Sequence, residues 1–308
     1  MVTREELMAE GLVQKFIRYI KVDTEGFEQA HEIPSSDGQW KLARMLASEL
    51  SEIGLSDVEV DDHAFVTGRL PSNLAGRAPA VGFIAHMDTV PGVPGAGVKH
   101  VLHRSYDGGD IEVAPGTVLS PRDTPALAKA VGCDIITSDG TTLLGADDKA
   151  GVAEIMQALV EMVKDPGHPH PDVWVAFTPD EETGRGIAHF PKNRFEARIA
   201  YTLDGGDLGE LQLETFNAIN GVVIAYGISS HTGTARGKMV NAVHLAAEVI
   251  ASIPATWRPE TTSGREGFIH PNDVEGNVER VRVKVIIRDF DRSGLELRER
   301  AFLDTLRG

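Results

Sequence analysis

The sequence predicts an α/β protein with two domains, 1–216 and 217–308. In the first part, short apolar runs bounded by polar or proline-rich segments alternate with amphipathic helical patterns. The second part has the order β-α-β-α with a weaker strand near Phe268–His270, as in a ferredoxin-like module that lacks its last strand. The length of 308 residues and the hydrophobic content of 42% support two buried cores.

Composition excludes several classes of function. The chain has 30 basic and 46 acidic residues, a formal charge of -16, and phosphate binding needs a basic surface, so we expect no nucleic-acid partner. The single cysteine, Cys133, excludes an internal disulfide and fits a reducing compartment. The sequence starts with a charged amphipathic segment, and its apolar runs are all shorter than the roughly 18 residues of a membrane span. We therefore expect a cytoplasmic protein with no membrane contact.

The first predicted elements are two helices and two strands. Apolar residues at helical spacing predict one helix over Glu5–Ile20 and another over Gln39–Ile53. The second helix ends at Gly54, a residue suited to a C-cap. Val58–Val60 and Phe65–Leu70 have the length and composition of short strands.

The segment VGFIAHMDTV (81–90) is the centre of the predicted site. Val81–Ala85 predicts a buried strand, and His86 follows at its carboxyl end, where open α/β sheets bind ligands. Because residues i and i+2 of a strand point the same way, Asp88 can accept the second ring N–H of His86 and fix which nitrogen faces a metal. Alone, a histidine at a strand end is more often a hydrogen-bonded structural residue than a ligand.

A long connection over 91–139 follows, rich in glycine and proline. A connection of this length is usually functional or contains small elements of its own. We interpret its histidines, His100 and His103, as surface-loop residues because nothing near them has metal-site spacing.

Asp147 lies between the apolar pair Leu143–Leu144 and a predicted helix that reaches about Lys164. An aspartate just before a helix is commonly its N-cap. Here Asp147 and Asp148 compete for that single position, so we interpret Asp147 as a bridging metal ligand.

Two further predicted strands lead into carboxylates. Val173–Phe177 precedes the run Asp180-Glu181-Glu182, and Ile199–Leu203 precedes Asp204. Three successive acids repel one another, so the run is costly unless a cation lies among them; a solvated acidic turn is the alternative. Carboxylates and one imidazole converging from four strand ends are what a two-zinc hydrolase requires.

In the second part, Ala218–Ile228 and Val278–Ile287 predict strands. Helices are expected up to about Ile253 and over Ser293–Leu306. The loop after the first strand contains His231, which on its own would more often be an ordinary loop residue.

These segments resemble the peptidase T family, the tripeptide aminopeptidases of the zinc-dependent aminoacylase/carboxypeptidase superfamily. The resemblance rests on GFIAHMDT, ITSDGTTLLGADDKAGVAEIM, VAFTPDEETG, YTLDGG, HTGTARGKMVNA and IIRDFDR, in family order and at family spacing. It implies a zinc-exopeptidase-like catalytic domain, with a mixed sheet flanked by helices, over 1–216. It also implies an inserted ferredoxin-like α+β lid and dimerisation domain over 217–308, through which two subunits form a homodimer.

The resemblance implies two zinc ions per subunit and a ligand set for them. His86 and Asp204 would bind one zinc ion, Glu182 would bind the other, and Asp147 would bridge the two. Family members continue well beyond the position of Gly308, so we expect the C-terminal part of the fold to be missing. By the resemblance, the missing part would include a late histidine, the third ligand of the zinc bound by Glu182. We also expect the shortened sheet to expose apolar surface.

Four further roles follow from the resemblance. Asp88 would orient the histidine ligand, and Glu181 would be the general base that takes a proton from a metal-bridging water and passes it to the leaving amine. His231 would polarise the scissile carbonyl across the dimer, although the family usually has His-Pro-Gly where this chain has HTG. Arg288 would hold a substrate carboxylate, unless it pairs with the neighbouring Asp289 or Asp291.

We therefore expect a zinc-dependent metallo-aminopeptidase that removes the N-terminal residue from tripeptides. One alternative is a truncated relative that is non-catalytic or binds metal weakly. Another is an N-acyl amino acid amidohydrolase on the same scaffold. The segments HEIPSSDGQWKL and DDKAGVAEIM favour the peptidase T family over the deacylases.

Overall fold

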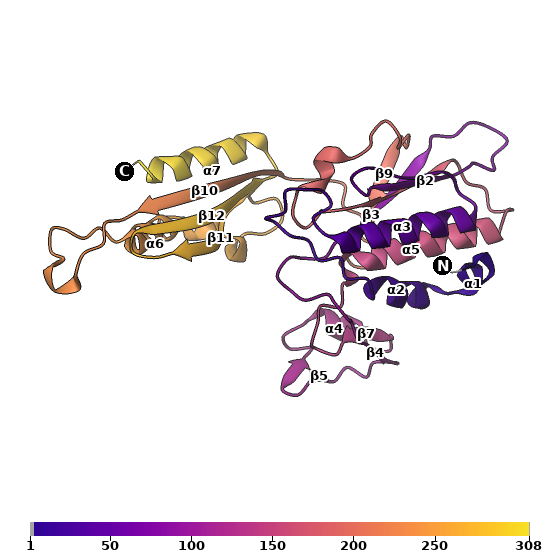
Figure 1. Ribbon diagram of the computed structural model, residues 1–308, viewed down its shortest axis with the longest axis horizontal. Helices are drawn as coiled ribbons and strands as arrows, with labels where there is room; N and C mark the ends of the chain where they lie inside the picture. The colour runs from indigo at the N-terminus through magenta and orange to yellow at the C-terminus, as the bar shows by residue number, and fades with distance from the viewer. Residues whose placement is uncertain (1–2, 308) are drawn as a thin grey trace. The chain divides into compact units, whose positions relative to one another are not determined.

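The computed structural model describes residues 3–307 (Figure 1). The chain forms two compact units that meet in sequence between Asp207 and Leu208. Unit 1 precedes this boundary and unit 2 follows it, and each has its own apolar core. Every helix within residues 3–307 is too short or too polar to cross a membrane.

Unit 1 is built on a five-stranded mixed sheet, as predicted. The strand order is β1-β2-β8-β3-β9, in which β3 is parallel to β8 and β9, and β2 is antiparallel to β1 and β8. The central strand β8 is buried along its whole length, which explains its continuous apolar sequence. The strands are β1 Ser56–Val60, β2 Val66–Leu70, β3 Val81–His86, β8 Val173–Thr178 and β9 Ile199–Thr202.

The edge strand β9 leaves apolar side chains in contact with solvent. Ile199 is 52% exposed and Tyr201 is 40% exposed. β3, next to it, is only partly covered, so the prediction that Val81–Ala85 is fully buried is wrong for Val81, Phe83 and Ile84.

Helices of unit 1 pack on the sheet and on one another. α3 contacts β1 and β2, α5 contacts β3, and α2 packs on α5 (Figure 1). α3 ends where predicted, because Gly54 adopts a left-handed φ of 109° and its N–H bonds back to Leu50 and Ser51. The helices are α1 Arg4–Ala9, α2 Leu12–Ile20, α3 Asp37–Ile53 and α5 Ala146–Lys164, with a 3-10 turn η1 at Gly186–His189.

The prediction of one continuous helix over Glu5–Ile20 is wrong. The chain leaves helical geometry at Glu10 and Gly11, both of which have extended backbones. Glycine favours such a break because it loses the most backbone entropy in a helix. The apolar spacing continues across the break, which is why periodicity alone did not reveal it.

The long connection contains small elements, as expected. β4 pairs with β7 and β5 pairs with β6, both antiparallel, around a small apolar cluster of Tyr106, Ile111 and Leu127. His103 lies in β4, where its Nε2 is 3.0 Å from the hydroxyl of Thr137. The elements are β4 His100–His103, β5 Ile111–Ala114, β6 Thr117–Leu119, α4 Ala126–Lys129 and β7 Ile135–Ser138.

Unit 2 is a three-stranded antiparallel sheet with two helices on one face. The strand order is β10-β12-β11. Alternate residues of β12, from Val281 to Ile287, are buried against α6 and α7, which produces the alternating sequence VRVKVII. β11 is longer than the predicted Phe268–His270. The prediction missed its second half because that half is mostly polar and exposed. The elements are β10 Asn217–Tyr226, α6 Ala242–Ala251, β11 Phe268–Gly276, β12 Arg280–Asp289 and α7 Arg292–Thr305, with 3-10 turns η2 Thr232–Thr234, η3 Ala255–Trp257 and η4 Pro259–Thr261.

Candidate metal centre

Three parallel strands deliver acidic and imidazole side chains to one edge of the sheet. β3 ends at His86, which lies opposite Thr178 at the end of β8. On the other side, Ile84 of β3 lies opposite Thr202, the last residue of β9. The segments that follow β8 and β9 therefore begin beside His86. These segments contain the pair Glu181–Glu182 and Asp204, respectively.

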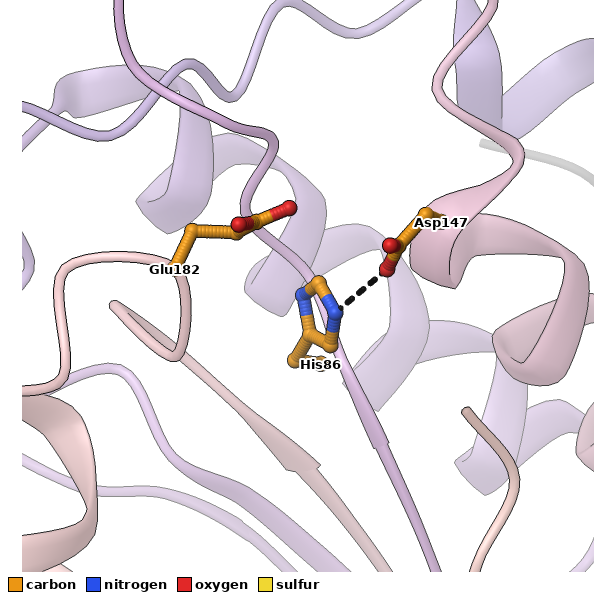
Figure 2. A group of neighbouring side chains, drawn as sticks. All are labelled: His86, Asp147 and Glu182. Carbon is orange, nitrogen blue, oxygen red and sulfur yellow. Dashed lines mark hydrogen bonds and ion pairs between the residues drawn. The ribbon is translucent and has the colours of Figure 1, made fainter. Parts of the chain in front are cut away.

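Asp147 reaches the same place from a different kind of element. Leu143 and Leu144 lie in irregular chain, so the prediction that a strand leads into Asp147 is wrong. Asp147 instead belongs to the distorted start of α5, where its own backbone and that of Asp148 are non-helical and the peptide between them is cis. Its side chain is 69% exposed, and its Oδ1 lies 2.8 Å from Nε2 of His86 (Figure 2).

Asp148 takes the capping position for which the two aspartates were expected to compete. Its Oδ1 accepts a hydrogen bond from the N–H of Gly151 at 3.2 Å, near the start of regular helix. Its Oδ2 accepts one from the main-chain N–H of His86 at 3.1 Å. Asp148 is buried and ties α5 to β3, which leaves Asp147 free to face the imidazole.

Carboxylates surround the imidazole of His86, whose side chain is only 3% exposed. Nδ1 lies 3.1 Å from the carbonyl oxygen of Asp88 and 3.4 Å from its Oδ1. Nε2 lies 3.9 Å from Asp204 and 4.0 Å from Glu181. Burial lowers the pKa of His86, but Asp88, Asp148 and Glu181 outweigh it and raise the pKa to about 10.

Asp88 also holds the segment that follows β8. Its Oδ1 accepts a hydrogen bond from the N–H of Glu181 and its Oδ2 accepts one from the N–H of Glu182, both at 3.0 Å. The side chain is completely buried. One carboxylate thus fixes the position of His86 relative to the two glutamates.

The donor set fits a divalent cation. Ligand atoms of His86, Asp147 and Glu182 lie within 4.8 Å of one another, as Figure 2 illustrates, and so do those of His86, Asp148 and Asp204. Imidazole nitrogen and carboxylate oxygen are typical zinc ligands. Burial is the largest cause that raises the pKa values of Glu182 and Asp204, and the negative charge of Asp147 adds to both. A bound cation would relieve this crowding of negative charge.

The remaining acids beside the cluster have distinct surroundings. Burial raises the pKa of Asp148 to about 8 and also raises that of Glu181, to which the charges of Asp204 and Asp88 add. Asp180, in contrast, points away from this cluster and bonds to Ser35 and Gln39. Sequence reasoning left the helix cap to one of the two aspartates, but it missed the bond from Asp148 to the main chain of His86 and the structural role of Asp180.

The two predicted substrate residues of unit 2 lie in that unit's loop and sheet. His231 is exposed and precedes η2, where its Nδ1 accepts a hydrogen bond from the N–H of Gly233 at 3.2 Å. Arg288 lies in β12 with its guanidinium 4.3 Å from the ring centre of Phe216. Its Nε is buried and has no hydrogen-bond partner within residues 3–307. Asp289 bonds instead to Arg298, so the neighbouring acid does not neutralise Arg288.

Comparison with known proteins places the chain in a family. Residues 213–301 match the family described as the peptidase dimerisation domain. Peptidase T of Geobacillus kaustophilus (strain HTA426) is 49% identical over 294 residues, which cover 95% of this chain and 72% of that protein. Peptidase T of Vibrio cholerae serotype O1 (strain ATCC 39315) is 48% identical over 290 residues, which cover 94% and 71%, respectively.

Solved structures agree with this assignment. Aminopeptidase PepT of Bacillus cereus ATCC 10987 aligns with 99% of this chain and 71% of its own, at a TM-score of 0.67 and 26% identity. A tripeptidase of Staphylococcus aureus subsp. aureus Mu50 shares the fold, at a TM-score of 0.66, 20% identity and coverage of 99% and 71%. On the identity and coverage of the peptidase T proteins of Geobacillus kaustophilus and Vibrio cholerae, the chain belongs to the peptidase T family.

Proposed function

We propose that this protein is a zinc-dependent aminopeptidase that removes the N-terminal residue from tripeptides. The observation that supports this most is the convergence of His86, Asp147 and Glu182 within 4.8 Å in a member of the peptidase T family. The solved relatives are named an aminopeptidase and a tripeptidase, which supports the choice of reaction and substrate.

The proposed ligands are all in unit 1. His86 and Asp204 would hold one zinc ion, Glu182 would hold a second, and Asp147 would contribute to both sites. Bound zinc supplies Lewis acidity toward the peptide carbonyl and a nucleophilic water at neutral pH. Asp88 keeps the imidazole oriented, because its carboxylate and carbonyl both lie beside Nδ1.

Glu181 is the proposed general base. Its main-chain N–H is fixed by Asp88, and its Oε2 lies 4.0 Å from Nε2 of His86, so its carboxylate borders the cluster while Glu182 serves as a ligand. Burial raises the pKa of Glu181, which improves its ability to accept a proton. In the proposed reaction Glu181 takes the proton of the attacking water and delivers it to the leaving amine.

Unit 2 supplies the proposed substrate contacts. We assign the catalytic domain to 1–216 and the lid and dimerisation domain to 217–308, a boundary nine residues after the one between the two compact units. Arg288 holds the peptide's C-terminal carboxylate, and His231 polarises the scissile carbonyl across the dimer. The match to the peptidase dimerisation domain supports a homodimer formed through this unit, and we place the protein in the cytoplasm.

The experiment that tests this function is cleavage of trialanine by protein whose mass has been verified. Release of free alanine, abolished by a chelator and restored by zinc, is the expected result. N-acetyl-trialanine serves as the control substrate, since an aminopeptidase needs a free amino terminus. Cleavage of the acetylated peptide, with none of trialanine, would instead support an N-acyl amino acid amidohydrolase.

A further inference from the structure

Asp180 is a buried carboxylate that the proposed reaction does not use. It lies immediately before Glu181 and Glu182, its side chain is completely buried, and its φ of 52° is in the left-handed region. Aspartate tolerates this region better than most residues. Its carbonyl oxygen accepts hydrogen bonds from the N–H groups of Arg185 and Gly186, so it also closes the loop that contains the two glutamates.

Donors in the first turn of α3 and in the segment just before it bind the carboxylate of Asp180. The N–H of Ser35 donates to Oδ2 at 2.8 Å, and the hydroxyl of Ser35 donates to Oδ1. Nε2 of Gln39 donates to Oδ1 at 2.9 Å. Arg185 adds an ion pair, with 3.5 Å between Nη2 and Oδ2.

Gln39 binds Asp180 at two points. While its Nε2 donates to the carboxylate, its Oε1 accepts a hydrogen bond from the main-chain N–H of Asp180 at 3.0 Å. Gln39 is itself completely buried in the first turn of α3. The side-chain amide therefore fixes both the backbone and the carboxylate of Asp180 relative to a rigid helix.

The two glutamates are consequently held from both sides. Asp88 binds the N–H groups of Glu181 and Glu182, while Asp180 anchors the preceding peptide to α3. Burying a carboxylate is costly unless its oxygens have partners, and here three hydrogen bonds and the ion pair with Arg185 supply them. Such an arrangement restricts how the chain turns at the point where both glutamate side chains emerge.

We propose that Asp180, held by Gln39, is a positioning residue that sets the orientation of Glu181 and Glu182. The inference rests on the proposed function for its catalytic consequence. Misplacement of a base or ligand by a fraction of an ångström lowers the rate of the chemical step more than it weakens substrate binding. A disturbed Asp180 should therefore lower kcat with little change in KM.

The donor and acceptor of this pair can be exchanged by mutation. Asp180→Asn places an amide N–H₂ opposite donors, and Gln39→Glu places two carboxylates opposite each other. In the double variant Asp180→Asn/Gln39→Glu, the introduced amide donates to the introduced carboxylate, which also still accepts from the N–H of residue 180. Rescue in the double variant reports on this one contact.

The control for general destabilisation is Glu49→Gln. Glu49 is also a buried carboxylate and lies on the same helix as Gln39, but its partners are Tyr19 and Arg18. We expect the kcat of Glu49→Gln, per folded molecule, to equal that of the wild type. Each Asp180 or Gln39 single variant should lose at least about tenfold in kcat, with KM changed less than about threefold, and the double variant should recover most of it.

A second readout does not depend on turnover. Cobalt(II) bound in place of zinc has visible absorption that changes with ligand position, so Asp180→Asn should alter this spectrum and the double variant should restore it. An unchanged spectrum and kcat in Asp180→Asn would overturn the positioning role, as would losses that the double variant does not recover. A wild-type chain that cleaves no tripeptide would overturn the proposed function, while the cobalt spectra still decide the positioning role. A wild-type chain that binds no cobalt would overturn both.

Discussion

The buried carboxylate of Asp148 accepts a hydrogen bond from the main-chain N–H of His86, 3.1 Å away and from a different element. Its neighbour Asp147 is exposed and faces the His86 ring. In Asp148→Asn, one of the two acceptor oxygens becomes an N–H₂ group that faces a main-chain N–H donor. This loss of a buried hydrogen bond should lower the free energy of unfolding by about 1–3 kcal/mol. Urea unfolding monitored by circular dichroism measures this change.

Asp147→Asn is the matched control for that variant. It should change stability by less than about 0.5 kcal/mol, because the side chain is mainly solvated. It should nevertheless weaken zinc binding at least about tenfold, since the carboxylate proposed to bridge the metal ions is replaced by a neutral amide. Equal loss of stability in the two variants would contradict the different roles assigned to these adjacent aspartates.

Zinc affinity should depend on pH through His86. Its pKa is raised from 6.5 to about 10, so at neutral pH zinc must displace a proton from the imidazole. Apparent affinity should therefore increase about tenfold per pH unit between about pH 6 and 8. Calorimetric titrations in buffers of different ionisation enthalpy would count the released proton. Affinity that is constant over this range would show that His86 binds zinc without losing a proton.

The same pKa shift has a consequence for stability without zinc. A histidine whose pKa is higher in the folded chain stabilises the fold fully below its unfolded pKa of 6.5. That contribution is lost as the pH rises through about 10. His86→Gln protein should lack this part of the pH dependence of unfolding.

Close packing against α3 makes Gly38 intolerant of a side chain. A Cβ atom at this position would lie 1.6 Å from the carbonyl oxygen of Asp23, a contact with rigid backbone. Gly38→Ala should therefore lower the free energy of unfolding by more than about 2 kcal/mol. Gly76→Ala is the control, because nothing lies within 4 Å of its added Cβ. Thermal unfolding of both variants measures the difference.

Much of the fold can be predicted from the sequence, because local rules decide it. Gly54 ends α3, and the alternating apolar residues of β12 pack on α6 and α7. The break at Gly11 and the polar half of β11 could not be predicted, since hydrophobic spacing continues through the first and does not mark the second. The polar half of β11 is a strand because it pairs with β12.

The sequence predicted which acidic and imidazole side chains of unit 1 come together, but not what each of them contacts. Apolar strands ending in His86, Glu181–Glu182 and Asp204 revealed which side chains meet. Asp180 could not be separated from the glutamates, because Gln39, which holds it, is 141 positions away in the chain. Adjacent acids look equivalent in sequence and differ only in what the fold places opposite them.

Arg288 should recognise the C-terminal carboxylate of the substrate. Its guanidinium is stacked on Phe216 rather than paired with Asp289, so it retains donors for a ligand. The wild type should cleave trialanine with a KM at least about tenfold lower than that of trialanine amide, since a charge-assisted contact is lost with the amide. Arg288→Ala should give the two peptides similar KM values. Undiminished discrimination in that variant would assign carboxylate recognition to another residue.

In the proposed reaction Glu181 moves the proton, while Glu182 and its neighbours bind the metal. Glu181→Gln tests it most directly, with zinc content and trialanine turnover measured on the same preparation. We expect wild-type zinc content and a loss of kcat of at least about a hundredfold, because general-base catalysis is removed without removing a ligand. Retained turnover with normal zinc content would contradict the assignment of Glu181 as the base, and loss of zinc would show that it is a ligand instead.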